Sequence, residues 1–319
     1  MRIRLLLPVI LLCAHATASD SISRAAFLFN SAFPPTGTIT APPLLEPEDA
    51  AKMAAGPHVT NRQGDVHGDV YILQYHGISP VERRYDRSRE NFRNDLERLY
   101  KDGFRPVTMT DYVENHMVVP HGASPVVMTF DDANPTQFKI LPNGEVDPNC
   151  AIGIWQAFYK THPDFPMKGM FYVVPTMMFG QRKLVDVKIK MLEAWGSEIG
   201  NHTMTHPFLS RLSDAAATKE IGSVMVYLAK KGITQHVHFC IPYGIFPRNR
   251  KLVESVTWAG KTWRLESNTL CGANPAPAPT SPKFKPYRIP RILSNEEPDG
   301  INYWMDQAEK GSVHLYVEP

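Results

Sequence analysis

Short apolar runs alternate with amphipathic segments from about residue 69 to the C-terminus. Residues 125–128 are continuously apolar, which is typical of a strand buried on both faces. Residues 91–101 carry Phe92, Leu96 and Leu99 at helical spacing, which predicts a helix with one buried face. By the same reasoning we predict strands at 70–75, 104–109, 126–130, 169–174, 197–200, 237–241 and 311–317, and helices at 91–101, 190–195 and 212–230.

This alternation predicts an α/β fold in which helices connect parallel strands. In barrels of this kind the catalytic side chains lie at the carboxyl ends of the strands. Polar residues that could act in catalysis or metal binding follow directly after three of the predicted strands. They are Asp131, Asp132, His202, His206 and Tyr243. We therefore expect these side chains to meet at one end of the sheet.

The N-terminal residues have the pattern of a secretory signal peptide. Arg2 and Arg4 precede the apolar run 5–12, and Ala16-Thr-Ala18 supplies a small-residue cleavage site. The run is much shorter than the roughly 20 apolar residues that span a bilayer. We therefore predict a protein that is secreted or periplasmic and has no transmembrane segment. Its predicted parts are a signal peptide at 1–18, a proline-rich and partly irregular leader at 19–67, and one domain at 68–319.

The composition changes this picture little. The formal net charge is +2, and 43% of the residues are hydrophobic, which is enough for a large core. A charge balance this close to zero does not favour nucleic acid or an anionic membrane as the partner. Beyond the signal peptide, Cys150, Cys240 and Cys271 have a spacing that matches no structural zinc site, and their odd number does not suit a disulfide scaffold.

Asp131 and Asp132 are adjacent carboxylates at the end of a predicted buried strand. Adjacent aspartates are often solvated turn residues, and that interpretation stays open for this pair. Two carboxylates this close cannot both stay charged at low cost unless a cation lies nearby. A bound metal ion would remove the conflict, with one carboxylate as a ligand and the other left as a base.

His202 and His206 are spaced so that both imidazoles can face one ion. Pro207 disfavours a helical conformation at His206, so we expect the pair in a loop. No glutamate follows His202, which excludes the His-Glu-x-x-His pattern of metalloproteases. With one carboxylate, two histidines form a ligand set that suits Zn²⁺ or a similar divalent ion and leaves coordination positions open. A helix-capping or surface pair is the alternative.

Four segments carry a resemblance to a known family: 71–78, Thr129-Phe-Asp-Asp-Ala133, His202-Thr-Met-Thr-His206 and Cys240-Ile-Pro-Tyr-Gly244. In this order they resemble the polysaccharide deacetylases, the NodB-homology group of carbohydrate esterase family 4. The resemblance runs from about Asp69 to the C-terminus and implies the family's distorted (β/α)₇ barrel. It also implies a metal-dependent hydrolase that removes acetyl groups from N-acetylated amino sugars of a cell-wall or exopolysaccharide glycan.

The resemblance implies a role for each residue of the candidate site. Asp132, His202 and His206 would hold one divalent ion, Zn²⁺ in the first place, with Co²⁺ or Ni²⁺ as alternatives. Asp131 would be the general base that deprotonates the attacking water. The backbone N–H of Tyr243 would stabilise the oxyanion that forms on the acetyl carbonyl. An acetylated polysaccharide or oligosaccharide is the implied substrate.

Three positions depart from the family pattern. Ala133 replaces a glycine, a mild change provided that φ stays negative there. Cys240 stands where the family has an arginine that pairs with the base, so we expect a raised pKa at Asp131. Val317 stands where relatives have a histidine that protonates the leaving amine.

Other residues offer substitutes for the missing groups. His314 lies on one face of a predicted strand and is the candidate catalytic acid, with His76 as a second candidate. Arg288 or Arg291 would replace the missing positive charge. Two other functions stay open: a non-catalytic glycan-binding relative that keeps the metal site but lacks the full acid and base set, and an O-acetyl esterase.

Overall fold

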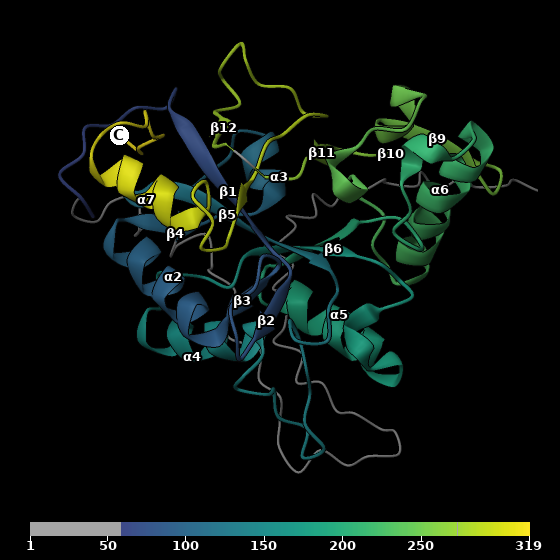
Figure 1. Ribbon diagram of the computed structural model, residues 1–319, viewed down its shortest axis with the longest axis horizontal. Coiled ribbons are helices and arrows are strands. Elements are labelled where there is room, and N and C mark those ends of the chain that lie inside the picture. Colours follow the sequence, from purple (N-terminus) through teal and green to yellow (C-terminus); the bar gives the residue numbers. More distant parts are fainter. Residues whose placement is uncertain (1–58, 273) are drawn as a thin grey trace, which may run out of the picture.

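The computed structural model describes residues 59–272 and 274–319, which form a curled, mainly parallel sheet with helices packed around it (Figure 1). The predicted signal peptide and residues 19–58 of the predicted leader lie outside the described residues. The strands are β1 (Asp69–Tyr75), β2 (Gly77–Ser79), β3 (Asp86–Ser88), β4 (Phe104–Pro106), β5 (Ser124–Asp132), β6 (Gly169–Val173), β7 (Glu198–Asn201), β8 (Phe239–Cys240), β9 (Ser255–Trp258), β10 (Lys261–Arg264), β11 (Asn268–Thr269), β12 (Ala276–Pro277) and β13 (Ile292–Leu293). The helices are α2 (Arg89–Lys101), α3 (Met109–Val113), α4 (Ala151–Thr161), α5 (Val185–Ala194), α6 (Asp214–Lys230) and α7 (Ile301–Glu309).

The main sheet has the strand order β11-β8-β7-β6-β5-β1-β12, with β4 paired to β5 and β13 paired to β1. Each of these pairings is parallel except that of β1 with β12. The predicted α/β fold is confirmed, and its sheet curls into an incomplete barrel. Because the central strands run in one direction, the carboxyl ends of β1, β5, β6, β7 and β8 share one edge.

Alternate residues of the central strands face two different hydrophobic cores, as the two-residue period of a strand requires. In β5, Val126, Met128 and Phe130 belong to the larger core that the helices cover. Val127 faces the smaller core inside the curl of the sheet. Asp131 is two strand positions beyond Thr129 and four beyond Val127, so it too faces the inside of the curl. The pleat of β5 therefore delivers one carboxylate to the interior of the incomplete barrel.

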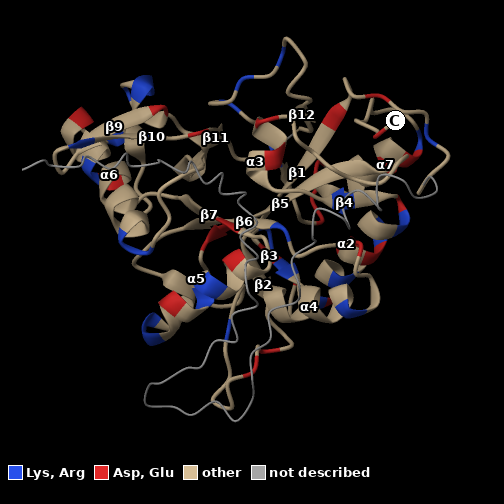
Figure 2. Ribbon diagram, turned by 180° about the vertical axis from the view of Figure 1, so that it is seen from behind, with Lys and Arg blue, Asp and Glu red and all other residues tan. Residues whose placement is uncertain are grey.

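The helices begin where the sequence supplies caps. Ser88 caps α2 by accepting a hydrogen bond from the backbone N–H of Asn91, and Ser213 caps α6 in the same way. Phe92, Leu96 and Leu99 lie on the buried face of α2, as their spacing predicts. Both signs of charge alternate along the outer faces of α2, α5 and α6 (Figure 2). Packing of one apolar face against the sheet positions these helices.

Two predicted strands differ from the structure. The segment 104–109 is a strand only to Pro106, because Thr108 caps α3 in a reciprocal capping box with Asp111. The predicted strand at 311–317 is wrong, since this segment makes only isolated bridges, of Leu315 to Asp69 and of Val317 to Asp65. The strand that joins β1 near the C-terminus is β13, two residues long and directly after the proline-rich segment.

The boundary predicted at residue 68 stays a prediction. Residues 59–67 run along the domain: the Val59 N–H donates to the carbonyl of His121, and Asp65 bridges Val317. Among the helices of the described residues, none combines the length and the apolar character that a membrane span requires.

Candidate active site

The carboxyl ends of three neighbouring strands carry the residues that the sequence singled out. β5 ends at Asp132, β7 ends at Asn201 immediately before His202, and β8 ends at Cys240 shortly before Tyr243. The structure brings Asp132, His202 and His206 together, as predicted.

The Asp132 carboxylate lies between two imidazoles. Its Oδ1 is 3.6 Å from Nε2 of His202 and 3.7 Å from Nε2 of His206. Asp132 has a φ of 77°, in the left-handed region, so its side chain leaves the regular alternation of β5. This turn lets two adjacent aspartates serve different neighbours: Asp131 faces the interior of the sheet, whereas Asp132 faces the histidine loop.

The tautomer of His202 is fixed by its surroundings. Its Nδ1 is 2.6 Å from the carbonyl oxygen of Cys240, and a carbonyl only accepts, so Nδ1 carries the proton. Nε2 is then left with a free lone pair that points at Asp132. A backbone carbonyl that holds the distal nitrogen in this way is the usual outer partner of a metal-ligating histidine.

His206 lies in a loop, as Pro207 predicts, and its φ of 58° is left-handed. The loop is held from both sides: the His206 N–H donates to Thr203 Oγ1, and the Thr203 N–H donates to Asn201 Oδ1. Burial lowers the pKa of His206, and the neighbouring His202 lowers it further. The imidazole is therefore kept neutral, the form that ligates a metal.

These donors fit a divalent ion. Asp132 Oδ1 lies 3.6 Å and 3.7 Å from the two imidazole nitrogens, close to the roughly 3.4 Å that separates ligands around a tetrahedral zinc. The buried trio Asp131, His202 and Cys240 is equally compact. A metal there is disfavoured, because burial raises the pKa of the Cys240 thiol and the Arg291 guanidinium occupies both Asp131 oxygens.

Asp131 is paired with a buried arginine. Arg291 donates from Nη1 to Oδ1 and from Nη2 to Oδ2 of Asp131, each at 2.8 Å. Burial by itself raises the pKa of Asp131, but the attraction and hydrogen bonds of Arg291 outweigh it and hold this pKa far below the usual range. The expectation of a raised pKa is therefore wrong. Its premise, that no arginine reaches the base, does not hold.

Cys240 makes this pairing possible. Its Sγ accepts a hydrogen bond from Arg291 Nη2 at 3.0 Å and lies 3.6 Å from Asp131 Oδ2. A small side chain at position 240 thus leaves room for a guanidinium that enters from β13. Arg288, the other candidate, is exposed and lies over the ring of Phe246 instead.

Residues 119–260 match the family described as polysaccharide deacetylase. Over this segment the chain resembles the polysaccharide deacetylases. The matched range includes Asp131, Asp132, both site histidines and Tyr243.

Three solved structures share this fold. The Streptococcus pyogenes deacetylase PplD, in complex with acetate, is 17% identical with a TM-score of 0.55, covering 79% of this chain and all (100%) of that one. A polysaccharide deacetylase from Bacillus cereus is 15% identical, with a TM-score of 0.52 and coverage of 76% and 69%. IcaB from Ammonifex degensii is 17% identical, with a TM-score of 0.50 and coverage of 72% and 94%. No curated protein matches the sequence.

Two glutamines hold Asp131 in place. Gln74 donates from Nε2 to Asp131 Oδ2 at 3.0 Å, and its Oε1 accepts the N–H of Gly272. Gln137 donates to the carbonyl oxygens of both Asp131 and His76. Sequence reasoning missed both residues. The alternation of β1, with Val70 and Ile72 facing the interior, was the available signal for Gln74.

His76 is the histidine that lies beside the base. Its Nε2 is 3.7 Å from Asp131 Oδ2, and its Nδ1 is buried without a hydrogen-bond partner in the described part of the chain. Burial lowers the pKa of His76, against the attraction of Asp131. This imidazole is therefore the histidine that lies nearest to the Asp131 carboxylate among those the sequence singled out.

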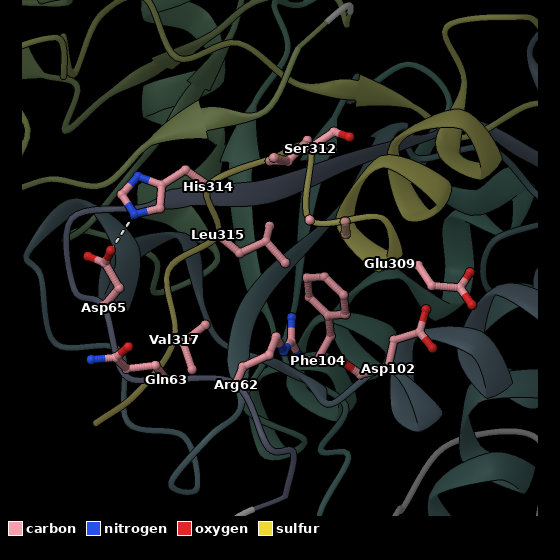
Figure 3. Close-up of a pocket in the computed structure, with 13 residues that line it drawn as sticks. Arg62, Gln63, Asp65, Asp102, Phe104, Glu309, Ser312, His314, Leu315 and Val317 are labelled. Carbon is pink, nitrogen blue, oxygen red and sulfur yellow. Dashed lines mark hydrogen bonds and ion pairs between the residues drawn. The ribbon is translucent and has the colours of Figure 1, made fainter.

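His314 lies elsewhere, which excludes it as the catalytic acid. Its backbone carbonyl accepts from the N–H of Asp69, at the start of β1, and its Nε2 pairs with Asp65. Figure 3 shows this pair in a pocket that Arg62, Phe104 and Val317 also line. Six residues separate Asp69 from the end of β1, so His314 is roughly 20 Å from the catalytic edge. Val317, which stands where relatives have the histidine that protonates the leaving amine, lines the same pocket, away from Asp131 and Asp132.

Tyr243 keeps its predicted place. It has a φ of 59°, in the left-handed region, and within the described residues its backbone N–H has no acceptor. Its ring contacts that of His206, with centroids 4.6 Å apart. The Tyr243 ring is therefore next to His206, and the role of its backbone N–H at the oxyanion stays a prediction.

The loop after Asp132 has a strained backbone, and hydrogen bonds from Phe179 and Lys188 hold it in place. Ala133 has a φ of 56°, so the replaced glycine is not the mild change expected, and an alanine in this region costs about 1–2 kcal/mol. The Ala133 carbonyl accepts from the N–H of Phe179, and the Lys188 ammonium donates to the carbonyls of Phe138 and Phe179. One buried cation thus ties together the loops that follow β5 and β6.

Proposed function

We propose that this chain is an exported, metal-dependent deacetylase that removes acetyl groups from N-acetylated amino sugars of a cell-wall or exopolysaccharide glycan. One observation carries the proposal. A carboxylate kept ionised by a buried arginine, Asp131, lies directly beside an Asp-His-His set whose donor atoms converge. This is the combination that metal-assisted hydrolysis requires: a base that is charged at neutral pH and a cation next to it.

Asp132, His202 and His206 would hold the metal, and their donors suit Zn²⁺, with Co²⁺ or Ni²⁺ as alternatives. When bound, a divalent ion polarises the acetyl carbonyl and makes the attacking water more acidic. Two adjacent carboxylates repel each other, and each would have its own compensating cation. Arg291 pairs with Asp131, and the metal would pair with Asp132.

The proton path runs through two side chains of this protein. Asp131 accepts the proton of the attacking water as the water oxygen bonds to the carbonyl carbon. Because protonated Asp131 is a far stronger acid than a histidine, the proton passes on to His76, whose Nε2 is 3.7 Å away. His76 then protonates the sugar nitrogen as the C–N bond breaks, which gives acetic acid and a neutral amine. The proton of the acetic acid ends on the amine at neutral pH, so the products are acetate and an ammonium group, and no proton is gained or lost.

The Tyr243 N–H completes the proposed site as the donor to the carbonyl oxygen that becomes negative. Removal of one such donor from other hydrolases costs about 2.7–4 kcal/mol of transition-state stabilisation. The left-handed backbone at Tyr243 turns this N–H away from the regular pattern of the chain. The conformation costs free energy, which is consistent with a functional constraint.

The pairing of Arg291 with Asp131 favours an enzyme over a non-catalytic glycan-binding relative. Arg291 supplies the positive charge that the family has at position 240 and that Cys240 lacks. An O-acetyl esterase would use the same groups. Acetate release should therefore be measured in parallel on N-acetylated chito-oligosaccharides and on an O-acetylated xylan. We expect release from the N-acetylated substrate. Release from xylan alone would replace the deacetylase proposal with the esterase.

A histidine pair tests the proton path. His76→Gln should reduce turnover by a factor on the order of 10²–10⁴, the usual contribution of general acid catalysis. His314→Gln is the matched control, since His314 is exposed and remote from the site, and should leave turnover unchanged. Equal activity of the two variants would remove His76 from the mechanism.

Export is part of the proposal and rests on the pattern of residues 1–18. Expression of the full chain in a bacterial host, followed by fractionation, should place the protein outside the cytoplasm. N-terminal sequencing should show that cleavage has occurred close to Ala18. An uncleaved protein in the cytoplasmic fraction would contradict export without bearing on the chemistry.

A further inference from the structure

Three exposed arginines gather on two neighbouring loops at the edge of the sheet that carries the candidate site. Arg211 belongs to the loop between β7 and α6, which also contains both site histidines. Arg248 and Arg250 belong to the segment that follows β8, the strand next to β7 in the sheet. We call these three residues the arginine cluster.

Contacts with the two loops hold the guanidinium groups in place. Arg248 donates from Nε to the backbone carbonyl of the residue before Arg211 at 3.2 Å, which joins one loop to the other. Cζ of Arg211 lies 4.4 Å from the centre of the Phe208 ring, and Cζ of Arg250 lies 5.3 Å from the centre of the Phe246 ring. A guanidinium that lies over a ring keeps the N–H groups around its rim available to donate. The cluster therefore presents ordered donors to the solvent.

The charges of the cluster are not neutralised by acids. Within residues 59–272 and 274–319, no carboxylate lies within ion-pair distance of these three side chains, whereas Arg98 on α2 is paired with acids of both α2 and α7. Three positive charges exceed the formal net charge of the whole protein, +2, so the cluster is a local concentration of charge on a nearly neutral molecule. Like charges held together repel one another, and a bound anion would relieve that repulsion.

The cluster adjoins the candidate metal ligands through a row of ring contacts. The rings of His206 and Tyr243 have centroids 4.6 Å apart. The Tyr243 ring stacks on that of Phe208 at 3.9 Å, and Phe208 in turn supports Arg211. The row thus leads from a ligand of the candidate metal site to a member of the cluster. A glycan that extends from the site along this row would bring its next units to the arginines.

We propose that Arg211, Arg248 and Arg250 bind the negatively charged groups of an acidic glycan, beyond the unit that is deacetylated. The inference rests on the proposed deacetylase function and adds a charge requirement to its substrate. A guanidinium pairs with the oxygens of a carboxylate or a phosphate through two parallel N–H···O bonds, so a uronic acid unit or a phosphodiester link supplies a matching group. The substrate is therefore a polymer that combines N-acetylated amino sugars with anionic groups.

An anionic membrane carries the same charge as such a glycan, and the position of the cluster argues against it. A bilayer seated on the arginines would also cover the row of rings and the candidate site next to them, so a glycan would have no entry. A glycan that continues from the site onto the cluster meets no such obstacle. The position of the cluster thus favours the substrate as the ligand.

The test compares one glycan with and without its charge. The full chain is given hyaluronan hexasaccharides, in which uronic acid and N-acetylglucosamine alternate, and the same hexasaccharides with their carboxylates reduced to alcohols. A polymer of N-acetylglucosamine joined by phosphodiester links is the third substrate. We expect acetate release with a lower KM from one of the two charged substrates than from the reduced hexasaccharide. Preference for hyaluronan assigns a carboxylate to the cluster, and preference for the polymer assigns a phosphate.

Substitutions at the cluster should reduce this preference. Arg248→Gln and Arg250→Gln should each raise KM for the preferred charged substrate about two- to fivefold, the usual contribution of one exposed ion pair. Arg248→Lys and Arg250→Lys keep the charge and should retain most of the preference. Arg93→Gln with Lys101→Gln removes two exposed positive charges from α2 and should match wild type. Added salt should raise KM for the charged substrate in wild type, and less so in the Arg248→Gln, Arg250→Gln double variant, because ions screen exposed charges.

Two kinetic results would overturn the inference: an equal KM for the charged and the reduced substrates, or a preference that survives in the Arg248→Gln, Arg250→Gln double variant. Sedimentation with phosphatidylglycerol vesicles tests the membrane. Vesicle binding that the double variant loses, without any preference among the glycans, would replace the acidic glycan with a membrane surface.

Binding provides a readout that does not depend on hydrolysis. In an Asp131→Asn background, calorimetry should show that the preferred charged glycan binds more tightly than the reduced hexasaccharide. Addition of Arg248→Gln and Arg250→Gln should remove the difference. If wild type releases no acetate from any substrate, the proposed function fails, and this difference in binding would still support the cluster as a site for an acidic glycan. Equal binding of the charged and the reduced glycans would exclude the site.

Discussion

The Arg291 guanidinium and the Asp131 carboxylate face each other through two hydrogen bonds of 2.8 Å, although the residues are 160 positions apart in the chain. Both side chains are buried, so each charge depends on the other for compensation. Thr129 Oγ1 accepts a further hydrogen bond from Arg291 Nη1. The arginine is thus fixed by β5 itself and places a permanent positive charge behind the base.

The first prediction concerns loss of this charge. Arg291→Ala leaves a buried carboxylate unpaired, which should lower the free energy of unfolding by about 3–5 kcal/mol. Burial, no longer opposed, should raise the pKa of Asp131 and move the acidic limb of the activity profile to higher pH. Arg288→Ala is the control, since Arg288 is exposed, and should resemble wild type in thermal unfolding and in activity. Similar behaviour of the two variants would contradict the assignment.

The sign of the effect on stability follows from the direction of the shift. In wild type the pKa of Asp131 is lower in the folded protein than in the unfolded chain, where it is near 3.9. The pair therefore contributes its full stability above that value, and the contribution falls as the pH drops toward the folded-state pKa. Arg291→Ala should abolish this part of the acid sensitivity.

The second prediction is that the charge can be moved to the other side of Asp131. Cys240 Sγ touches both Arg291 and the carboxylate, so position 240 reaches the same oxygen from β8. The double exchange of Cys240→Arg with Arg291→Cys should recover part of the activity lost in Arg291→Ala. Cys240→Arg alone should destabilise the protein, because two guanidinium groups would then compete for one buried carboxylate. A double variant no more active than Arg291→Ala would show that the β13 position is required.

The third prediction separates the roles of the two aspartates. Asp131→Asn should keep the bound metal and lose turnover by a factor on the order of 10²–10⁴, the usual value for general base catalysis. Asp132→Asn and the double variant His202→Ala, His206→Ala should lose metal and turnover together. Elemental analysis of protein purified without chelators gives the metal content. Loss of metal from Asp131→Asn with retention in Asp132→Asn would exchange the two assignments.

The fourth prediction concerns Lys188, which ties the loops after β5 and β6. Burial lowers the pKa of its ammonium from 10.5 to about 8. Between these values the unfolded chain binds more protons than the folded one, so the contribution of Lys188 to stability should rise with pH, by roughly 3 kcal/mol across the window. Below pH 8 the lysine is charged in both states, and its contribution is constant.

Chemical denaturation between pH 7.5 and 10.5 measures this contribution. Lys188→Met should be less stable at pH 7.5, because the carbonyls of Phe138 and Phe179 lose their donor, and its stability should rise less with pH than that of wild type. Lys183→Met, which replaces an exposed lysine nearby, should keep the wild-type dependence. A parallel dependence in wild type and Lys188→Met would contradict the prediction.

Local sequence patterns were enough to predict the parallel sheet and the edge of it that carries the candidate site. Continuous apolar runs such as 125–128 are typical of buried strands, and parallel strands bring their carboxyl ends to one edge, so Asp131, Asp132 and the two histidines were expected to approach one another. Pro207 likewise kept His206 out of a helix. These inferences rest on local periodicity and on backbone sterics, which act within a few residues.

The distant residues that complete the site could be identified only from the folded chain. Arg291 directly precedes β13, which has two residues, too few for any period to be recognised. The alternating segment 311–317 gave a stronger pattern and bridges the start of β1 instead. Arg291 rather than Arg288 meets the base, and His76 rather than His314 adjoins it, because the curl of the sheet sets these distances. Spacing along the chain contains no information about a contact across 160 residues, which depends on how the whole sheet closes.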